Sequence, residues 1–248
     1  MKRKIFIVGT LIMSLGLFLA GCGSKKSTEK TAKPEVLPSA LSLINDSTKK
    51  QAAHANYHID FNTTRATGDQ TVVIEYDTSY APGDAATAGD YQVTVNDKAK
   101  EKLAIYLSET NLYVKDKAKW VNATSEIKKL GTNIDTISKT ANVAYLKKLP
   151  KQITQTAKVS DEFGKYTVKM GVSGAAADVL YNNQNSTSST SKNTVESVSY
   201  TYVVDKKSKL PISLERETKM DVSGKTYTET VSVDYSDWGK AAVEVPKF

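Results

Sequence analysis

The side chain with the clearest chemistry in this sequence is the thiol of Cys22, the only cysteine among 248 residues. It ends the tetrapeptide Leu19-Ala20-Gly21-Cys22, which follows the charged start Met1-Lys2-Arg3-Lys4 and an apolar run over residues 5–19. A charged start, an apolar stretch and small residues before a cut define an export signal. The pattern is that of a bacterial lipobox. We therefore predict cleavage between Gly21 and Cys22, with a diacylglycerol and acyl chains such as palmitate attached to Cys22.

The alternative for this leader is an uncleaved transmembrane helix. A membrane span needs about 20 apolar residues, whereas the run over residues 5–19 is shorter and includes Gly9, Ser14 and Gly16. The lipid anchor is therefore the favoured interpretation. It predicts a cell-membrane protein on the extracytoplasmic face, with the membrane as partner through the diacylglycerol on Cys22.

The sequence has only two imidazoles, His54 and His58, which are spaced i, i+4 as in a helical metal-binding pair. A metal site needs further ligands at short distance. The neighbouring Asp60 projects along a predicted strand, and the predicted helix ends between the two histidines. We therefore predict surface histidines and no metal site.

Residues 125–128 read Ser-Glu-Ile-Lys, which matches the Ser-x-x-Lys pattern of penicillin-recognising enzymes. Residues 47–50 fit the same pattern, and the companion motifs Ser-Asp-Asn and Lys-Thr-Gly do not occur in the sequence. A helix-capping serine beside a solvated lysine explains the match better. With no other nucleophile motif in view, we predict no catalytic residue, no cofactor and no enzymatic activity.

Charge and composition divide the chain into three parts, which we predict to be a signal peptide (1–21), the lipidated cysteine with a flexible tether (22–36) and a single domain (37–248). The tether lacks apolar periodicity and should be unfolded. The whole chain carries a formal charge of +7, and removing residues 1–21 with their three cations leaves +4. This mild excess disfavours nucleic acid as a partner.

Hydrophobic periodicity predicts the elements of the domain. A helix is expected over residues 39–55, with Leu41, Ile44, Thr48 and Ala52 on its apolar face. A second helical region after residue 123 carries Ile127, Leu130 and Ile134. Further helical turns are expected over 141–149 and 175–181. Strands are expected over 57–61, 70–80, 91–96, 102–108, 111–115, 153–159, 166–172, 197–204, 210–215 and 226–235, and a polar surface loop over 182–194.

Three strands in the last third of the sequence alternate strictly between apolar and polar residues. Tyr200 and Tyr202, for example, are separated by Thr201, and Val231 and Val233 by Ser232. An antiparallel sheet with one apolar face must cover that face, and the amphipathic helices are available to do so. The short connections favour antiparallel pairing. The sequence thus predicts an α+β fold in which a curved antiparallel sheet, an incomplete barrel, has helices covering its concave face.

A family resemblance supports this fold. The order of anchored cysteine, tether, helix and a long meander with an internal helical pair resembles the LolA/LppX-like lipoprotein fold of bacterial envelopes. The phrases Asn111-Leu112-Tyr113-Val114, Lys119-Trp120-Val121-Asn122 and Val233-Asp234-Tyr235-Ser236 resemble uncharacterised lipoproteins of Gram-positive bacteria. The resemblance implies a concave apolar side that holds the acyl chains of a lipid or lipoprotein. It supplies no binding motif from which a functional residue could be transferred.

Two functions remain open at this point. The first is a non-enzymatic lipoprotein that binds a lipid or other apolar envelope ligand in a half-barrel cavity. The second is a structural or interaction module of the cell envelope, with a packed core, a protein partner and no small ligand. A pocket of several hundred cubic ångströms would favour the first. The residues predicted to line such a cavity are Tyr57, Ile59, Phe61, Ile127, Leu130, Ile134, Tyr200, Tyr202, Tyr227, Val231 and Val233.

Overall fold

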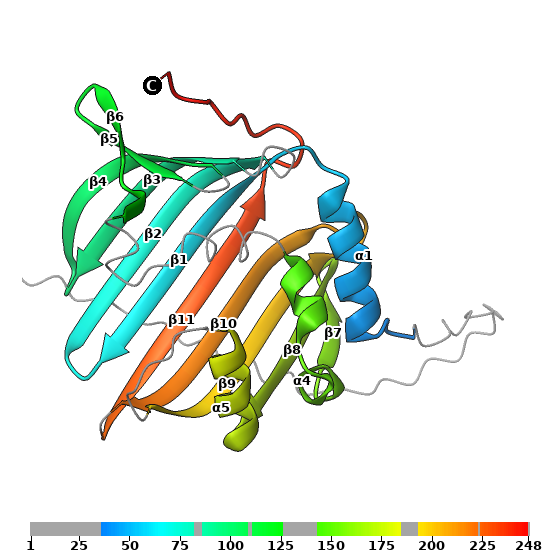
Figure 1. The fold of residues 1–248 in the computed structure, drawn as a ribbon. Helices are drawn as coiled ribbons and strands as arrows, with labels where there is room; N and C mark the ends of the chain where they lie inside the picture. The colour runs from blue at the N-terminus through cyan, green and yellow to red at the C-terminus, as the bar shows by residue number, and fades with distance from the viewer. Residues whose placement is uncertain are drawn as a thin grey trace, which may run out of the picture. The chain divides into compact units, whose positions relative to one another are not determined.

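The computed structural model describes residues 36–81, 86–108, 111–125, 143–184, 193–222 and 224–247 (Figure 1). The predicted signal peptide, the lipidation site Cys22 and the tether up to residue 35 lie outside the described residues, as do Ile127, Leu130 and Ile134. The division of the chain at these boundaries therefore stays a prediction. Within the described ranges, no helix has the length and apolar character needed to cross a membrane.

The described residues form one antiparallel sheet of 11 strands in the order β6-β5-β4-β3-β2-β1-β11-β10-β9-β8-β7. The N-terminal strands are β1 (Tyr57–Thr67), β2 (Gln70–Ala81), β3 (Ala86–Val95), β4 (Lys98–Leu107), β5 (Leu112–Asp116) and β6 (Lys119–Asn122). The C-terminal strands are β7 (Lys158–Glu162), β8 (Lys165–Ser173), β9 (Asn193–Asp205), β10 (Pro211–Val222) and β11 (Lys225–Ser236).

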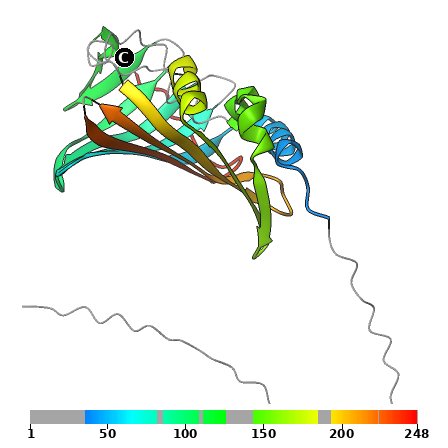
Figure 2. The ribbon, with the colours of Figure 1, turned by 90° about the horizontal axis from the view of Figure 1, so that it is seen from below.

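Two meanders, β1 to β6 and β7 to β11, meet where the first strand pairs with the last. In that pairing Ile59 lies opposite Tyr235 and Phe61 opposite Val233. Strands β6 and β7 stand at the two ends of the strand order, so the sheet is not closed. Figure 2 shows its curvature. The predicted incomplete antiparallel barrel is confirmed.

Strand alternation decides which side chains enter the core. On β1, Tyr57, Ile59 and Phe61 are buried, while His58 and Asp60 point to the other face. Successive strand side chains point to opposite faces, so a single buried face selects every second residue. Full burial of an apolar side chain of this size contributes about 1.5–3 kcal/mol. The inner face of the sheet therefore holds most of the core.

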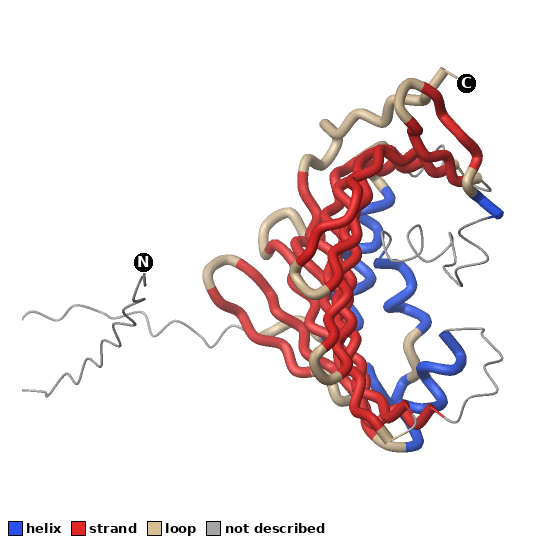
Figure 3. Tube along the Cα trace, turned by 90° about the vertical axis from the view of Figure 1, so that its left-hand side faces the viewer, coloured by secondary structure: helices blue, strands red, loops and turns tan. Residues whose placement is uncertain are grey.

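Four helical elements lie on the concave side of the sheet, as Figures 2 and 3 show. They are α1 (Ala40–Ala52), the 3-10 helix η1 (Val143–Lys148), α4 (Lys151–Gln155) and α5 (Ala175–Gln184). Helix α1 packs against η1, α4 against β8, and α5 against β8 and β9. The predicted placement of helices over the concave face is thus confirmed for the described helices.

Helix α1 begins after the N-cap Ser39, whose hydroxyl accepts a hydrogen bond from the Ser42 amide at 3.1 Å. Of its predicted apolar face, Ile44 and Thr48 are buried as expected, whereas Leu41 is 51% exposed and Ala52 is also exposed. The buried stripe instead includes polar residues with partners inside the fold. The Gln51 side chain accepts a hydrogen bond from the Val143 amide at 3.0 Å, and the Ser47 hydroxyl pairs with that of Tyr202.

Two predicted strands also require correction. Residues 153–155 belong to α4, which follows Pro150, and Ile153 is buried as a helical residue. The register of β10 against β9 shifts between Pro211 and Ser213, so Leu214 is buried while Ile212 is only half-buried. A residue inserted into one strand moves the following side chains to the other face, which simple alternation does not anticipate.

Candidate functional site

The concave face is closely packed beneath the described helices. In Figure 1 these helices lie over the half of the sheet formed by β7 to β11. Tyr57, Tyr200 and Tyr202 have 0–1% of their surface exposed. Of the residues predicted to line a cavity, seven belong to this buried core and Tyr227 is half-buried against it. The seven are Tyr57, Ile59, Phe61, Tyr200, Tyr202, Val231 and Val233.

The other half of the concave face carries an apolar surface that is only half-buried. We call it the β2–β4 inner surface. Ile74 lies opposite Val93, and Tyr91 lies opposite both Tyr76 and Leu103, so these side chains share the inner face. Its members, all of them half-buried, are Val72, Ile74, Tyr91, Val93 and Leu103.

Three charged side chains also point to the concave side, where they form what we call the Arg–Glu cluster. The Glu229 side chain is only 8% exposed. Its Oε2 accepts a hydrogen bond from Arg65 Nε at 2.9 Å, and its Oε1 accepts one from Arg216 Nη2 at 2.8 Å. Arg65 lies directly opposite Glu229 in the pairing of β1 with β11. A nearly buried carboxylate thus holds two guanidinium groups from different strands.

Sequence reasoning missed this cluster, although a signal existed. Arg65 continues the inward series that begins with Phe61, and Glu229 stands two residues before the inward Val231. Charged residues are almost never fully buried unless they are paired. A charge at an apolar-face position of a predicted strand therefore points to a partner elsewhere on that face.

Polar side chains surround the Arg–Glu cluster. Thr218 lies opposite Glu229 on β10 and is fully buried. Among the described residues, neither Thr218 Oγ1 nor Arg216 Nε has a hydrogen-bond partner. Burial raises the pKa of the Tyr181 hydroxyl, and the charge of Glu229 raises it further while both arginines lower it. Tyr181 brings α5 next to the cluster.

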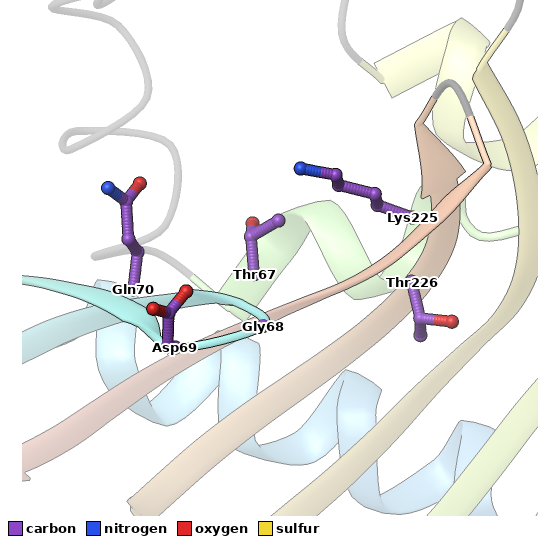
Figure 4. A pocket seen from close by; sticks show the side chains of 6 residues that line it. All are labelled: Thr67, Gly68, Asp69, Gln70, Lys225 and Thr226. Atoms are coloured by element: carbon purple, nitrogen blue, oxygen red, sulfur yellow. The ribbon is translucent and has the colours of Figure 1, made fainter.

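An open hollow of about 610 Å³ lies at the rim of the sheet, next to the cluster. Its lining comes from the β1–β2 turn and from the start of β11, namely Thr67, Gly68, Asp69, Gln70, Lys225 and Thr226. In Figure 4 the side chains of Thr67 and Lys225 extend to the same side of their strands, and Thr226 extends to the opposite side. Thr67 lies opposite Tyr227, one inward position beyond the pair of Arg65 with Glu229.

The two histidines are separated by the fold. His54 packs against Trp238 with ring centroids 5.5 Å apart. His58 Nε2 lies 3.4 Å from Asp60 Oδ1 and 3.2 Å from Asp77 Oδ1, on the outer face. The three side chains could bring three ligand atoms together, and Asp77 joins them only through strand pairing. The same arrangement is also explained by surface contacts of an imidazole with two exposed carboxylates, without a metal. The predicted absence of a metal site therefore stays a prediction.

The serines of the two Ser-x-x-Lys matches differ in their setting. Ser47 is buried in α1 and its hydroxyl pairs with Tyr202, whereas Lys50 is exposed on the same helix. Ser47 is therefore a packing residue rather than a nucleophile. Ser125 is exposed, and the lysine that completes its motif, Lys128, lies outside the described residues.

Comparisons with known proteins give a family and several similar solved structures. The model of DUF6612, a family of unknown function, matches residues 39–247. No curated protein matches the sequence. The solved structures that are similar include two mycobacterial proteins, one of them the lipoprotein LppX. LppX of Mycobacterium tuberculosis is 14% identical, with a TM-score of 0.45 over 82% of this chain and 96% of that one. LprF of Mycobacterium bovis is 13% identical, with a TM-score of 0.44 over 84% and 95%.

A LolA superfamily protein of Nitrosomonas europaea is 11% identical, with a TM-score of 0.24 over 85% of this chain and 96% of that one. LppX and the LolA superfamily are also the names in the resemblance noted from the sequence. Their low identities and TM-scores say nothing of what this chain binds.

Proposed function

The chain belongs to DUF6612, a family of unknown function, and we propose that it is a lipid-anchored extracytoplasmic lipoprotein. It binds a lipid or another apolar envelope molecule on the concave face of its sheet and catalyses no reaction. The observation that carries this proposal is the β2–β4 inner surface, an apolar patch that is only half-buried beside the buried core of the concave face.

The chemistry of the concave face suits an amphipathic molecule. Small-molecule sites are mostly apolar and carry a few polar groups that fix the orientation of the ligand. Here Val72, Ile74 and Val93 offer the apolar part. The Arg–Glu cluster and the hollow beside it offer the polar part at one end of the same face.

The predicted anchor keeps the domain close to the membrane, which contains such ligands. Two acyl chains bind a membrane stably, whereas one chain binds it only reversibly. A flexible tether over residues 22–36 reaches on the order of 20 Å. Cys22→Ala should abolish incorporation of labelled palmitate, and continued incorporation would refute the anchor without bearing on the binding face.

Native mass spectrometry after mild extraction tests the binding proposal. We expect a lipid to remain bound to the wild-type protein. Val93→Glu places a charge on the β2–β4 inner surface and should remove the bound lipid. Its matched control is Thr94→Glu, the next residue on β3, which points to the outer face and should leave the lipid in place. Melting curves of both variants separate loss of binding from loss of folding.

An interaction module of the envelope is the second candidate, and the packing under the helices favours it. Tyr57, Tyr200 and Tyr202 are fully buried on the concave face. If the extracted wild-type protein is consistently free of lipid, a protein partner on the concave face becomes the better explanation.

A further inference from the structure

We infer that the ligand is an anionic amphiphile whose headgroup is held by Arg65 and Arg216, with Lys225 beside them at the rim. This inference rests on the proposed function and adds the class of ligand and the residues that select it. Four observations support it: the balance of charge, the unpartnered buried atoms, the adjoining apolar surface and the open hollow.

The balance of charge at this end of the concave face is positive. Arg65, Arg216 and Lys225 are opposed by Glu229 and Asp69 among the described residues, so three cations face two carboxylates. A guanidinium has five N–H donors in a fork that fits carboxylate and phosphate oxygens. Each arginine donates one of its hydrogen bonds to Glu229, and the Arg65 side chain is 48% exposed. Donors therefore remain within reach of a bound anion.

Buried polar atoms next to Glu229 indicate the same chemistry. Thr218 is fully buried, and its Oγ1 and Arg216 Nε have no hydrogen-bond partner in the part of the chain that the structure describes. Buried polar atoms of this kind are rare in folded proteins. The Arg216 Nε–H is a donor and the Thr218 hydroxyl can donate. An acceptor near these two atoms, such as an oxygen of an anionic headgroup, would therefore satisfy both.

The cluster adjoins the apolar surface directly. Arg65 lies opposite Val72 in the pairing of β1 with β2, and Thr63 lies opposite Ile74. A molecule whose head contacts Arg65 can therefore lay its apolar chain along Val72, Ile74 and Val93. This continuity favours an amphiphile over a small inorganic anion. The hollow lined by Thr67 and Lys225 lies beyond Arg65 toward the rim of the sheet, because Thr67 is the next residue on β1 that points inward. A headgroup can enter from solvent through this hollow.

The test compares two compounds that share one chain and differ in their head, oleate and oleyl alcohol. Each is titrated against the purified full-length protein carrying the neutral fluorescent probe N-phenyl-naphthylamine. We expect oleate to displace the probe at roughly tenfold lower concentration, which corresponds to about 1.4 kcal/mol. Inorganic phosphate alone should displace none of it.

Three variants assign the preference to the cluster. Arg65→Gln should remove most of the preference for oleate and leave oleyl alcohol unchanged, while Arg216 still pairs with Glu229. Glu229→Gln frees both guanidinium groups from their carboxylate and should increase the affinity for oleate. Lys219→Gln is the matched control, because Lys219 follows Thr218 on β10 but points to the outer face, where it pairs with Glu217 at 3.2 Å.

The outcomes separate the two proposals. Equal displacement by oleate and oleyl alcohol would overturn the headgroup inference and leave the apolar ligand in place. A preference that survives in Arg65→Gln, or displacement by phosphate as effective as by oleate, would also overturn the inference. Failure of the protein to bind the probe or either compound would overturn both.

Discussion

Replacing Glu229 tests the energetics of the Arg–Glu cluster most directly. The carboxylate is 8% exposed, and its two partners differ in exposure, with Arg216 at 19% and Arg65 at 48%. Removing one partner of a buried ion pair costs about 3–5 kcal/mol, because the other charge is left buried without compensation. Arg65 can turn toward water, so its share of the loss is small. Glu229→Met should therefore lower the free energy of unfolding by about 3 kcal/mol, mostly through Arg216.

Two further variants follow from the same reasoning. Arg65→Met leaves Glu229 paired with Arg216, and it should cost at most about 1 kcal/mol, as for an exposed pair. The double variant Glu229→Met with Arg216→Met removes both buried charges and should be more stable than Glu229→Met alone.

Urea denaturation followed by tryptophan fluorescence measures these differences. For a domain of this size a loss of about 3 kcal/mol should lower the melting temperature by roughly 6–12 °C. The reasoning is refuted if Arg65→Met costs as much as Glu229→Met. It is also refuted if the double variant is less stable than Glu229→Met, since an unpaired buried Arg216 would then not be the source of the loss.

Three other predictions follow from the structure. Burial and the nearby charge of Asp60 raise the pKa of the Asp234 carboxyl, so ionisation of this group destabilises the folded protein as the pH rises. Asp234→Asn should therefore raise the free energy of unfolding by about 0.5 kcal/mol at neutral pH. Thermal melts should show that this gain vanishes in acid. Burial raises the pKa of the Tyr57 and Tyr202 hydroxyls above their ordinary 10.0, so stability falls as the pH rises past the pKa of tyrosine in the unfolded chain. Tyrosinate absorbance should therefore appear together with unfolding. Tyrosinate from these residues in the folded protein would contradict this expectation. A Cβ on Gly89 would lie 2.0 Å from the Asp77 carbonyl oxygen, so Gly89→Ala should lower the free energy of unfolding in urea titrations by about 2 kcal/mol or more. Gly68 lies at a turn with φ +59° and open space around it, so Gly68→Ala should cost only about 1 kcal/mol.

Local pattern was sufficient where a residue's fate depends on its neighbours in the chain. The alternation of Tyr57, Ile59 and Phe61 with polar residues predicted a strand with one buried face, and α1 was predicted at nearly its observed bounds. Short connections predicted antiparallel pairing, and the one-sided strands predicted a cover of helices. These features follow from backbone geometry with periods of 2 and 3.6 residues.

Local pattern failed where contacts between distant segments decide the outcome. Leu41 is exposed because the packing of α1 against η1 favours a stripe that includes Gln51, which bonds to the Val143 amide. The register shift in β10 depends on its pairing with β9 and has no mark in the local alternation. A helix or strand can offer several faces, and its neighbours select one.

The sequence by itself determined a sheet with one apolar face, because that feature depends on a short repeat. The export signal and the lipidation of Cys22 depend on adjacent residues, and they stay predictions from the sequence. Only the tertiary structure brought Arg65 to Glu229 across 164 positions of sequence and placed Arg216 on the other side of the same carboxylate. Strand order and register set which side chains meet across β1, β10 and β11. A site built from three strands of an antiparallel sheet exists only once those strands have paired.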